Sequence, residues 1–371
     1  MPARPQHLDR EHPDTRHPDT RHSAHRYAEH RPPEHPPPDH RAWAIRATGS
    51  YLPGPPIPSE DVSRELGLDP GWIERRTGIR GRHAAAPGQA ASDLAAEAAR
   101  RALDAAGLGP RDIGLIVLGT STPDELGPAT ACRVQALLGA RRAAAFDIAA
   151  ACTGFVYGLQ AAVGWLATAR PGPAPHALVI GVEVYSRFLD PGDRATRALF
   201  GDGAAAAVVG PAPAPYGIGP LTLGSDGTRA GDVLIPAGGS RRPAGPGTLA
   251  ERAHTIHMDG RAVRDFITEI FPRLVGEAAE DAGVKPADLD LVVPHQPNPR
   301  LVASLAAEAG LEPAQLAIAG HDAGNIGAAS LPYALDRAVR TRGIAPGELV
   351  LLAGFGAGLT WARTVVTWPP G

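Results

Sequence analysis

Two stretches of this sequence, one in each half of the chain, repeat the same pattern. Residues 102–122 (ALDAAGLGPRDIGLIVLGTST) and 278–298 (AAEDAGVKPADLDLVVPHQPN) share identical residues at corresponding positions. In each stretch a helical pattern ends at a glycine suited to a left-handed cap, and a proline that cannot continue the helix follows. A short apolar run, typical of a strand buried on both faces, comes next. The repetition predicts a chain built from two similar halves.

The rest of the chain continues this alternation of helices and strands. Apolar runs predict strands, and periodic apolar patterns predict helices. The predicted strands are 143–148, 176–186, 204–210 and 348–353, and the predicted helices are 92–106, 261–282 and 298–310. This order favours an α/β fold with helices packed against sheets. The proline-rich segment 211–216 divides the body into an N-terminal half, 43–212, and a C-terminal half, 213–371.

Residues 1–42 differ in composition from the body. They hold eight of the fourteen histidines, many prolines and few apolar residues, so they cannot bury enough surface to offset the entropy of ordering. We therefore expect a disordered His- and Pro-rich tail. The five-residue spacing of most histidines does not keep them on one helical face, which favours an inert extension over metal binding, although both stay open.

Composition excludes several classes of function. A formal net charge of −3 provides no strong basic field for nucleic acid. The two cysteines are too few for a disulfide framework, which fits a reducing, cytoplasmic location. Neither cysteine has a further Cys or His nearby at the spacing of metal ligands. We therefore expect no metal site. The uncharged segment 148–169 is long enough to span a membrane, but its small and polar residues favour a buried helix.

Three residues have local contexts suited to catalysis. Cys152 follows a predicted strand and begins the uncharged helix, where the dipole and free N–H groups stabilise a thiolate; the alternative is an inert buried thiol. His295 directly follows a buried strand, although a hydrogen-bonded loop histidine is the simpler explanation. Asn325 lies near glycines and by itself predicts only a turn. Cys132 has no such context and is expected to pack in the interior.

The order of four motifs points to one enzyme family. AAACTGF, PHQPN, GNIGAAS and GFGAGLTWA resemble the motifs of the β-ketoacyl-acyl-carrier-protein synthase III family of the thiolase superfamily. The segments WIERRTGIRGRH and DPGDRATRALFGDGAAAAVV support the resemblance, which extends over residues 43–371. The resemblance implies a thiolase fold, with five αβαβα layers made from two duplicated halves, and a homodimer.

The resemblance also implies a two-stage reaction. Cys152 takes an acyl group from acyl-CoA as a thioester, and a malonyl group on acyl carrier protein then loses carbon dioxide to form an enolate that attacks this thioester. His295 and Asn325 are implied to donate hydrogen bonds to the enolate oxygen. Backbone N–H groups of Cys152, Gly356 and Ala357 are implied to form a second oxyanion hole. No permanently bound cofactor is implied, because acyl-CoA is a substrate.

The remaining implied residues surround the substrate entrance and the acyl group. Each has a simpler alternative, either surface charge or packing. The implied CoA-binding residues are Trp72, Arg76, Arg194 and Asn298, the implied carrier-protein docking residue is Arg300, and the implied acyl-pocket residues, contributed to the neighbouring subunit, are Leu126 and Gly127.

Several positions depart from the family pattern. Gly127 stands where a bulky aromatic residue is common, and Ile326 and Gly327 replace polar residues beside Asn325. Ala357 replaces a common glycine, and an alanine would be strained there if the position requires a positive φ. These changes favour a specialised substrate.

Alternatives to this condensing function stay open. The enzyme could start fatty acid chains or prime a polyketide, or it could transfer an acyl group from Cys152 to a carrier protein or small molecule without decarboxylation. A non-catalytic partner subunit is disfavoured by the complete Cys–His–Asn set. A thiolase is disfavoured because no cysteine follows Cys152.

Overall fold

The computed structural model describes residues 42–169, 172 and 174–370. The predicted tail therefore lies outside the described residues, except for Ala42, which is already the first residue of strand β1. The described residues all belong to one compact unit, His40–Gly371. Within this part of the chain, no helix combines the length and the apolar character needed to cross a bilayer.

The first sheet is built from strands that precede residue 213. Its strand order is β1-β7-β6-β4-β5. β4 is parallel to both β5 and β6, whereas β7 is antiparallel to β6 and β1. The strands are β1 (Ala42–Tyr51), β4 (Ile113–Gly119), β5 (Ala144–Ile148), β6 (His176–Val184) and β7 (Asp202–Ala212).

The second sheet is built from strands that follow residue 216. Its order is β12-β13-β14-β8, and β9 also pairs with β14. β12 and β13 are parallel, and the other pairs are antiparallel. The strands are β8 (Gly217–Ile218), β9 (Thr222–Ser225), β12 (Leu291–Pro294), β13 (Leu349–Gly356) and β14 (Thr360–Thr367).

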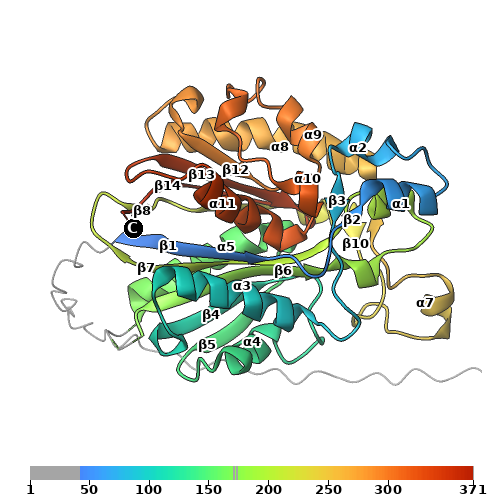
Figure 1. The fold of residues 1–371 in the computed structure, drawn as a ribbon, viewed down its shortest axis with the longest axis horizontal. Helices are drawn as coiled ribbons and strands as arrows, with labels where there is room; N and C mark the ends of the chain where they lie inside the picture. The colour runs from blue at the N-terminus through green and yellow to red at the C-terminus, as the bar shows by residue number, and fades with distance from the viewer. Residues whose placement is uncertain (1–41, 170–171, 173, 371) are drawn as a thin grey trace, which may run out of the picture. The chain divides into compact units, whose positions relative to one another are not determined.

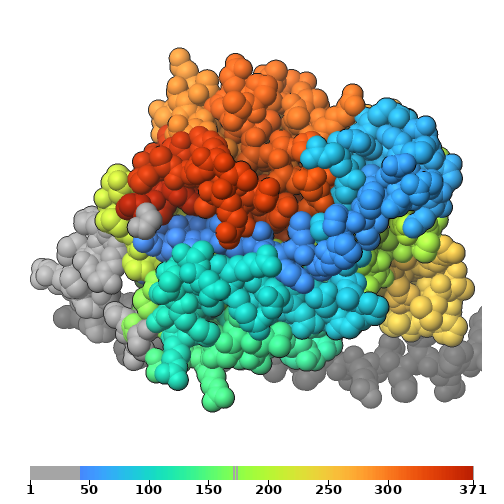
Figure 2. All heavy atoms as spheres, viewed as in Figure 1, coloured from blue at the N-terminus to red at the C-terminus, as the bar shows by residue number. Residues whose placement is uncertain are grey.

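Helices form three layers around these two sheets (Figure 1). α3 (Ala91–Ala106) and α4 (Thr130–Leu138) pack on the outer face of the first sheet. α5 (Gly154–Thr168) and α11 (Ser330–Thr341) share one apolar core with both sheets. α8 (Gly260–Asp281) and α9 (Pro299–Ser304) pack on the outer face of the second sheet. The predicted five-layered αβαβα thiolase fold is confirmed, and Figure 2 shows β1 lying between the layers of the two halves.

Short elements connect these layers and surround the site. They are β2 (Ile57–Pro58), α1 (Ser59–Glu65), α2 (Trp72–Thr77), β3 (Gly81–Arg82), α6 (Arg194–Arg197), β10 (Val233–Leu234), α7 (Pro246–Ala250), β11 (His257–Met258) and α10 (Gly320–Ala323), together with the 3₁₀ turns η1 (Pro110–Asp112), η2 (Ala151–Thr153), η3 (Tyr185–Phe188), η4 (Gly227–Arg229), η5 (Pro286–Asp288), η6 (Pro313–Gln315) and η7 (Gly327–Ala329).

The repeated sequence pattern forms the same structure twice. In the first copy α3 ends at Gly107 with a φ of 65°, and η1 leads into the fully buried β4. In the second copy α8 is followed by Gly283 with a φ of 70°, and η5 leads into the fully buried β12. The carboxylates of Asp112 and Asp288 each accept a hydrogen bond from the backbone N–H three residues earlier. The identical residues therefore share structural roles at this joint.

Some element boundaries differ from the sequence predictions. The predicted strand 176–186 ends at Val184, because the chain turns into η3 and brings Tyr185 into the site. The predicted helix 298–310 is shorter in the structure, where α9 ends at Ser304. β5 lies at the edge of its sheet and is therefore only partly buried, although all its residues except Asp147 are apolar.

Candidate active site

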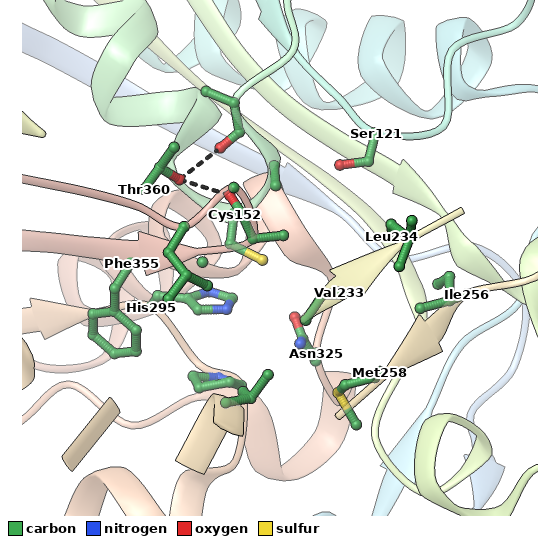
Figure 3. Close-up of a pocket in the computed structure, with 18 of the residues that line it drawn as sticks. Ser121, Cys152, Val233, Leu234, Ile256, Met258, His295, Asn325, Phe355 and Thr360 are labelled. Atoms are coloured by element: carbon green, nitrogen blue, oxygen red, sulfur yellow. Dashed lines mark hydrogen bonds between the residues drawn. The ribbon is translucent and has the colours of Figure 1, made fainter. Parts of the chain in front are cut away.

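The predicted catalytic side chains all line one cavity of about 400 Å³. Cys152 comes from the first half, whereas His295 and Asn325 come from the second. Figure 3 shows these three side chains directed toward a common space. Apolar side chains of the β10–β11 region also line the cavity, namely Val233, Leu234, Ile256 and Met258.

Two glycines place Cys152 at the floor of the cavity. Cys152 lies in η2, directly before α5, and is buried. A β-carbon on Gly119, at the end of β4, would come within 2.7 Å of the backbone of Gly154, the first residue of α5. Because both positions are glycine, the start of α5 packs directly on β4. Ala151 takes a φ of +44°, an uncommon conformation for a residue with a side chain.

The environment of Cys152 does not favour the thiolate, contrary to the sequence expectation. Burial, followed by the charge of Glu183, raises the pKa of the Cys152 thiol to about 12. Backbone N–H groups of Cys152 and Ala357 act in the opposite direction but are outweighed. The Cys152 side chain is therefore a neutral thiol, because desolvation exceeds the effect of the helix terminus.

His295 is a buried, neutral imidazole. It follows β12, and its backbone N–H donates to the carbonyl oxygen of Ala353 at 2.8 Å. Its ring packs edge-on against Phe355, with centroids 5.5 Å apart. Burial lowers the pKa of His295 to about 3, and its Nδ1 has no hydrogen-bond partner among the residues that the structure describes. A neutral ring can donate from only one of its nitrogens.

The loop around Asn325 orients its amide group. The N–H of Gly327 donates to Oδ1 of Asn325 at 2.9 Å, and the hydroxyl of Ser330 lies 3.5 Å from the same oxygen. The amide nitrogen of Asn325 remains for a ligand in the cavity. A β-carbon on Gly181 of β6 would come within 2.2 Å of the carbonyl oxygen of Ala328, so this glycine lets the loop rest on the strand.

The loop after β13 brings backbone N–H groups to Cys152. Gly356 and Ala357 both line the cavity, and the N–H of Ala357 is directed at the sulfur of Cys152. The expected strain at Ala357 is absent, because Ala357 does not take a positive φ. The positive φ of this loop, 129°, falls on Gly358 instead.

The predicted CoA-binding residues lie outside the residues that line the cavity. Trp72 begins α2, and the guanidinium of Arg76 lies over its ring, 5.0 Å from the centroid. Arg194 is exposed at the start of α6. Asn298 caps α9, and its Oδ1 accepts a hydrogen bond from the N–H of Leu301 at 3.0 Å. The cap leaves its amide nitrogen available.

The predicted docking and acyl-pocket residues are also on the surface. Arg300 is exposed and donates to the carbonyl oxygen of Arg75 at 2.5 Å. Leu126 is 88% exposed, and neither it nor Gly127 lines the cavity of its own chain. Cys132 is exposed too, contrary to the expectation that it packs in the interior.

Sequence reasoning missed a buried polar group behind Cys152. Glu183, at the end of β6, accepts hydrogen bonds from the N–H of Ser121 at 3.1 Å and the hydroxyl of Thr122 at 2.9 Å. Tyr185 lines the cavity beside it. The available signal was this single acidic residue within the otherwise apolar end of the strand sequence HALVIGVEV.

In the described part of the chain, no group of three or more His, Cys, Asp or Glu side chains is arranged to hold a metal ion. The cavity offers a thiol, an imidazole, an amide and backbone N–H groups, which is a set suited to acyl transfer.

Comparison with known proteins identifies related enzymes. The family models for 3-oxoacyl-[acyl-carrier-protein] synthase III and for its C-terminal part match residues 146–227 and 279–368. A β-ketoacyl-[acyl-carrier-protein] synthase III of Caldanaerobacter subterraneus is 44% identical over 88% of this chain and 98% of its own length. An acetoacetyl CoA synthase of a Streptomyces strain is 44% identical over 87% of this chain and 98% of its own length.

Solved structures show the same relationship. 3-Oxoacyl-(acyl carrier protein) synthase III of Pseudomonas aeruginosa has a TM-score of 0.80 and 38% identity, covering 89% of this chain and 99% of that chain. The priming β-ketosynthase of a polyketide biosynthetic pathway has a TM-score of 0.81 and 34% identity, covering 91% of this chain and all of that chain.

Proposed function

The chain belongs to the 3-oxoacyl-[acyl-carrier-protein] synthase III family, and from that premise we propose that it condenses an acyl group from acyl-CoA with a malonyl thioester. The observation that carries this proposal is the convergence of Cys152, His295 and Asn325 on one cavity. These residues come from segments that lie far apart in the sequence. The starter is an acyl group for fatty acid or polyketide synthesis.

In the first stage Cys152 is acylated. Its sulfur attacks the thioester carbonyl of acyl-CoA, the carbon–sulfur bond to CoA breaks, and the thiol proton leaves with the CoA sulfur. The N–H groups of Cys152 and Ala357 are positioned to stabilise the negative charge on the carbonyl oxygen. Because the thiol pKa is about 12, the proton must be removed as the sulfur attacks rather than before substrate binds.

In the second stage the malonyl thioester loses its carboxylate as carbon dioxide. The electron pair of the broken bond forms an enolate, whose carbon attacks the acyl group on Cys152 and expels the sulfur. A neutral imidazole at His295 and the amide nitrogen of Asn325 are suited to donate to the enolate oxygen. Neither side chain is a carboxylate, which would repel the enolate. The complete donor set supports condensation over simple acyl transfer.

The acceptor is proposed to be malonyl-acyl carrier protein, with malonyl-CoA as a second candidate. The relationship to an acetoacetyl CoA synthase motivates this second candidate. Carrier proteins are expected to dock on basic surfaces. Here Arg300 donates to a backbone carbonyl, and the nearby Arg75 and Arg80 pair with Asp69 and Asp322. This internal pairing reduces the positive charge available to an acidic partner.

We also propose that the protein is a cytoplasmic homodimer that pairs through β5. This strand lies at the edge of the first sheet and exposes 39% of Phe146. An unpaired strand edge with an exposed aromatic residue favours pairing with a second chain. The exposed Leu126 follows β4, the neighbour of β5, so the same contact would bring Leu126 and Gly127 to the partner. Light scattering should give a dimer mass, and Phe146→Asp should shift it toward a monomer.

The decisive experiment separates the two stages of the reaction. The protein is incubated with a panel of acyl-CoAs, its mass is measured, and then malonyl-CoA or malonyl-carrier protein is added while carbon dioxide is recorded. Acylation of the wild type and of Cys132→Ala, but not of Cys152→Ala, followed by carbon dioxide and a β-ketoacyl product, is expected. Acylation without carbon dioxide release would overturn condensation in favour of acyl transfer, and the preferred malonyl thioester identifies the acceptor.

A further inference from the structure

Glu183 is a buried acid that the reaction described above does not use. Its side chain is fully buried at the end of β6. No basic side chain among the described residues forms an ion pair with it. A buried carboxyl group without a cation is costly unless hydrogen bonds compensate for its lost hydration. Its hydrogen-bond partners therefore indicate what it does.

On one side Glu183 holds the wall of the cavity formed by residues 120–122. The N–H of Ser121 donates to both carboxylate oxygens at 3.1 Å, and the hydroxyl of Thr122 donates at 2.9 Å. The Thr122 oxygen itself accepts from the N–H of Val184 at 2.8 Å. This second bond directs the hydroxyl proton toward Glu183. Thr120 and Ser121 line the cavity directly.

On the other side Glu183 contacts the loop that orients Asn325. The N–H of Ala328 points at Oε1 of Glu183 at 3.4 Å. A β-carbon on Gly327 would lie 2.7 Å from Cγ of Glu183 and 2.5 Å from the hydroxyl of Tyr185. The loop is therefore packed directly against these two side chains, which explains why position 327 is a glycine with a φ of +51°.

Consecutive N–H groups of this loop have different partners. The N–H of Gly327 donates to Oδ1 of Asn325, and the next N–H, of Ala328, faces Glu183. The orientation of the Asn325 amide thus depends on a turn whose following peptide lies against Glu183. The contact is made by a side chain of the first half on a loop of the second half.

We propose that Glu183 is a positioning residue for Asn325: it fixes the Asn325 loop against the Thr120–Thr122 wall and thereby supports decarboxylation of the malonyl thioester. The inference rests on the condensing function proposed above. Asn325 serves the second stage, so loss of Glu183 should slow decarboxylation more than acylation of Cys152.

The experiment measures the two stages separately in purified full-length variants. Acylation of Cys152 is followed by intact mass after mixing with acyl-CoA. Pre-acylated enzyme is then mixed with malonyl thioester, and carbon dioxide release is followed in a single turnover. Two variants change the acid: Glu183→Gln keeps one acceptor oxygen, and Glu183→Met keeps none. The third, Gly327→Ala, adds a β-carbon on the loop side of the same contact and should push the loop away from Glu183.

We expect Glu183→Met and Gly327→Ala to lower decarboxylation about 10-fold relative to acylation, a part of the 10²- to 10³-fold loss expected for removing a whole oxyanion donor. Glu183→Gln should lie between these variants and the wild type. Asp336→Asn is the matched control: Asp336 is also a buried acid, but it binds Thr48, Ser50 and Arg340 instead of the loop. It should leave the ratio of the two rates unchanged.

A double-mutant cycle distinguishes positioning from general destabilisation. If Glu183 acts through Asn325, then Glu183→Gln should not slow decarboxylation further in an Asn325→Ala background. An equal loss in both backgrounds, or equal loss of both stages in Glu183→Gln, overturns the proposal. If Glu183→Met does not fold, the rates of Glu183→Gln and Gly327→Ala test the proposal. A wild type that releases no carbon dioxide would refute the condensing function itself.

Discussion

Gly356 lies directly against Cys152, so that a β-carbon on Gly356 would come within 2.7 Å of Cβ and 3.2 Å of Sγ of Cys152. These atoms belong to the side chain and backbone of Cys152, which cannot move aside without displacing the sulfur. This contact joins the end of β13, in the second half, to the start of α5, in the first half. The position of the thiol therefore depends on both halves.

The Gly356–Cys152 contact predicts the effect of a single methyl group. Gly356→Ala should slow acylation of Cys152 at least ~10-fold and lower the free energy of unfolding by about 1–3 kcal/mol, as expected for overpacking. Acylation is followed by intact mass and stability by urea unfolding. Gly276→Ala is the control, since nothing lies within 4 Å of a β-carbon at that helical position. Normal acylation of Gly356→Ala would contradict the close contact.

The reactivity of Cys152 should increase with pH without levelling off. Burial and Glu183 hold the thiol pKa at about 12, so the thiolate fraction grows about tenfold per pH unit below that value. We expect the rate of alkylation by iodoacetamide to rise continuously between pH 6.5 and 9.5. The measurement uses Cys132→Ser, so that the exposed thiol does not contribute. A plateau below pH 9 would show that the resting thiol is far more acidic.

His295 should make the protein less stable in acid. Burial lowers its pKa from 6.5 to about 3, so the fold holds the neutral ring while the unfolded chain binds a proton. This contribution is present above pH 6.5 and is lost as pH falls toward 3. Between pH 7 and 5 the loss amounts to about 2 kcal/mol at most, at 1.4 kcal/mol per pH unit. Urea unfolding of His295→Gln should lack this part of the slope; equal slopes would refute a neutral buried ring.

Glu183 should change stability with the opposite sign. Burial raises its pKa from 4.5 to about 8, so its contribution is present below pH 4.5 and is lost as pH rises through 8. Between pH 6 and 8 the free energy of unfolding of Glu183→Gln should therefore rise by up to about 2 kcal/mol relative to the wild type. The titratable groups that face Glu183 are Cys152 and Tyr185, and burial raises the pKa of both. A stability difference that is constant across this pH range would contradict the prediction.

Trp72 should affect recognition of CoA without affecting chemistry. Its ring and the guanidinium of Arg76 form a stacked pair on α2, a surface suited to an adenine ring. Trp72→Ala should raise KM for acyl-CoA about tenfold and leave kcat nearly unchanged, as expected for loss of uniform binding. An acyl-pantetheine substrate, which has no adenine, provides the control. An equal rise in KM for both substrates would show that Trp72 does not bind the adenine.

Much of the architecture could be predicted from local patterns. The repeated helix–glycine–proline–strand pattern predicted the joints before β4 and β12, because capping and strand burial depend on neighbouring residues. Boundaries were less predictable where a contact distant in sequence decides them. Tyr185 continues an apolar strand pattern, yet the structure turns it into the cavity.

The catalytic candidates were found by motif, but their electrostatics were not. The local context of Cys152 suggested a thiolate, and only the assembled structure showed that burial and Glu183 outweigh the helix terminus. Glu183 carries no motif, since its partners come from the segment after β4 and from the loop after Asn325. The hydrogen bond from Arg300 to the carbonyl oxygen of Arg75 was equally invisible in the sequence.

Local patterns and motifs in the sequence establish the α/β design with two halves and the family, and they identify a cysteine, a histidine and an asparagine as catalytic candidates. The protonation states depend on the assembled fold, in which Cys152 is a neutral thiol near Glu183 and His295 is a neutral ring. The physical reason is that desolvation and Coulomb interactions depend on which distant segments meet around a group. Local sequence patterns record helix caps and buried strands, but not those distances.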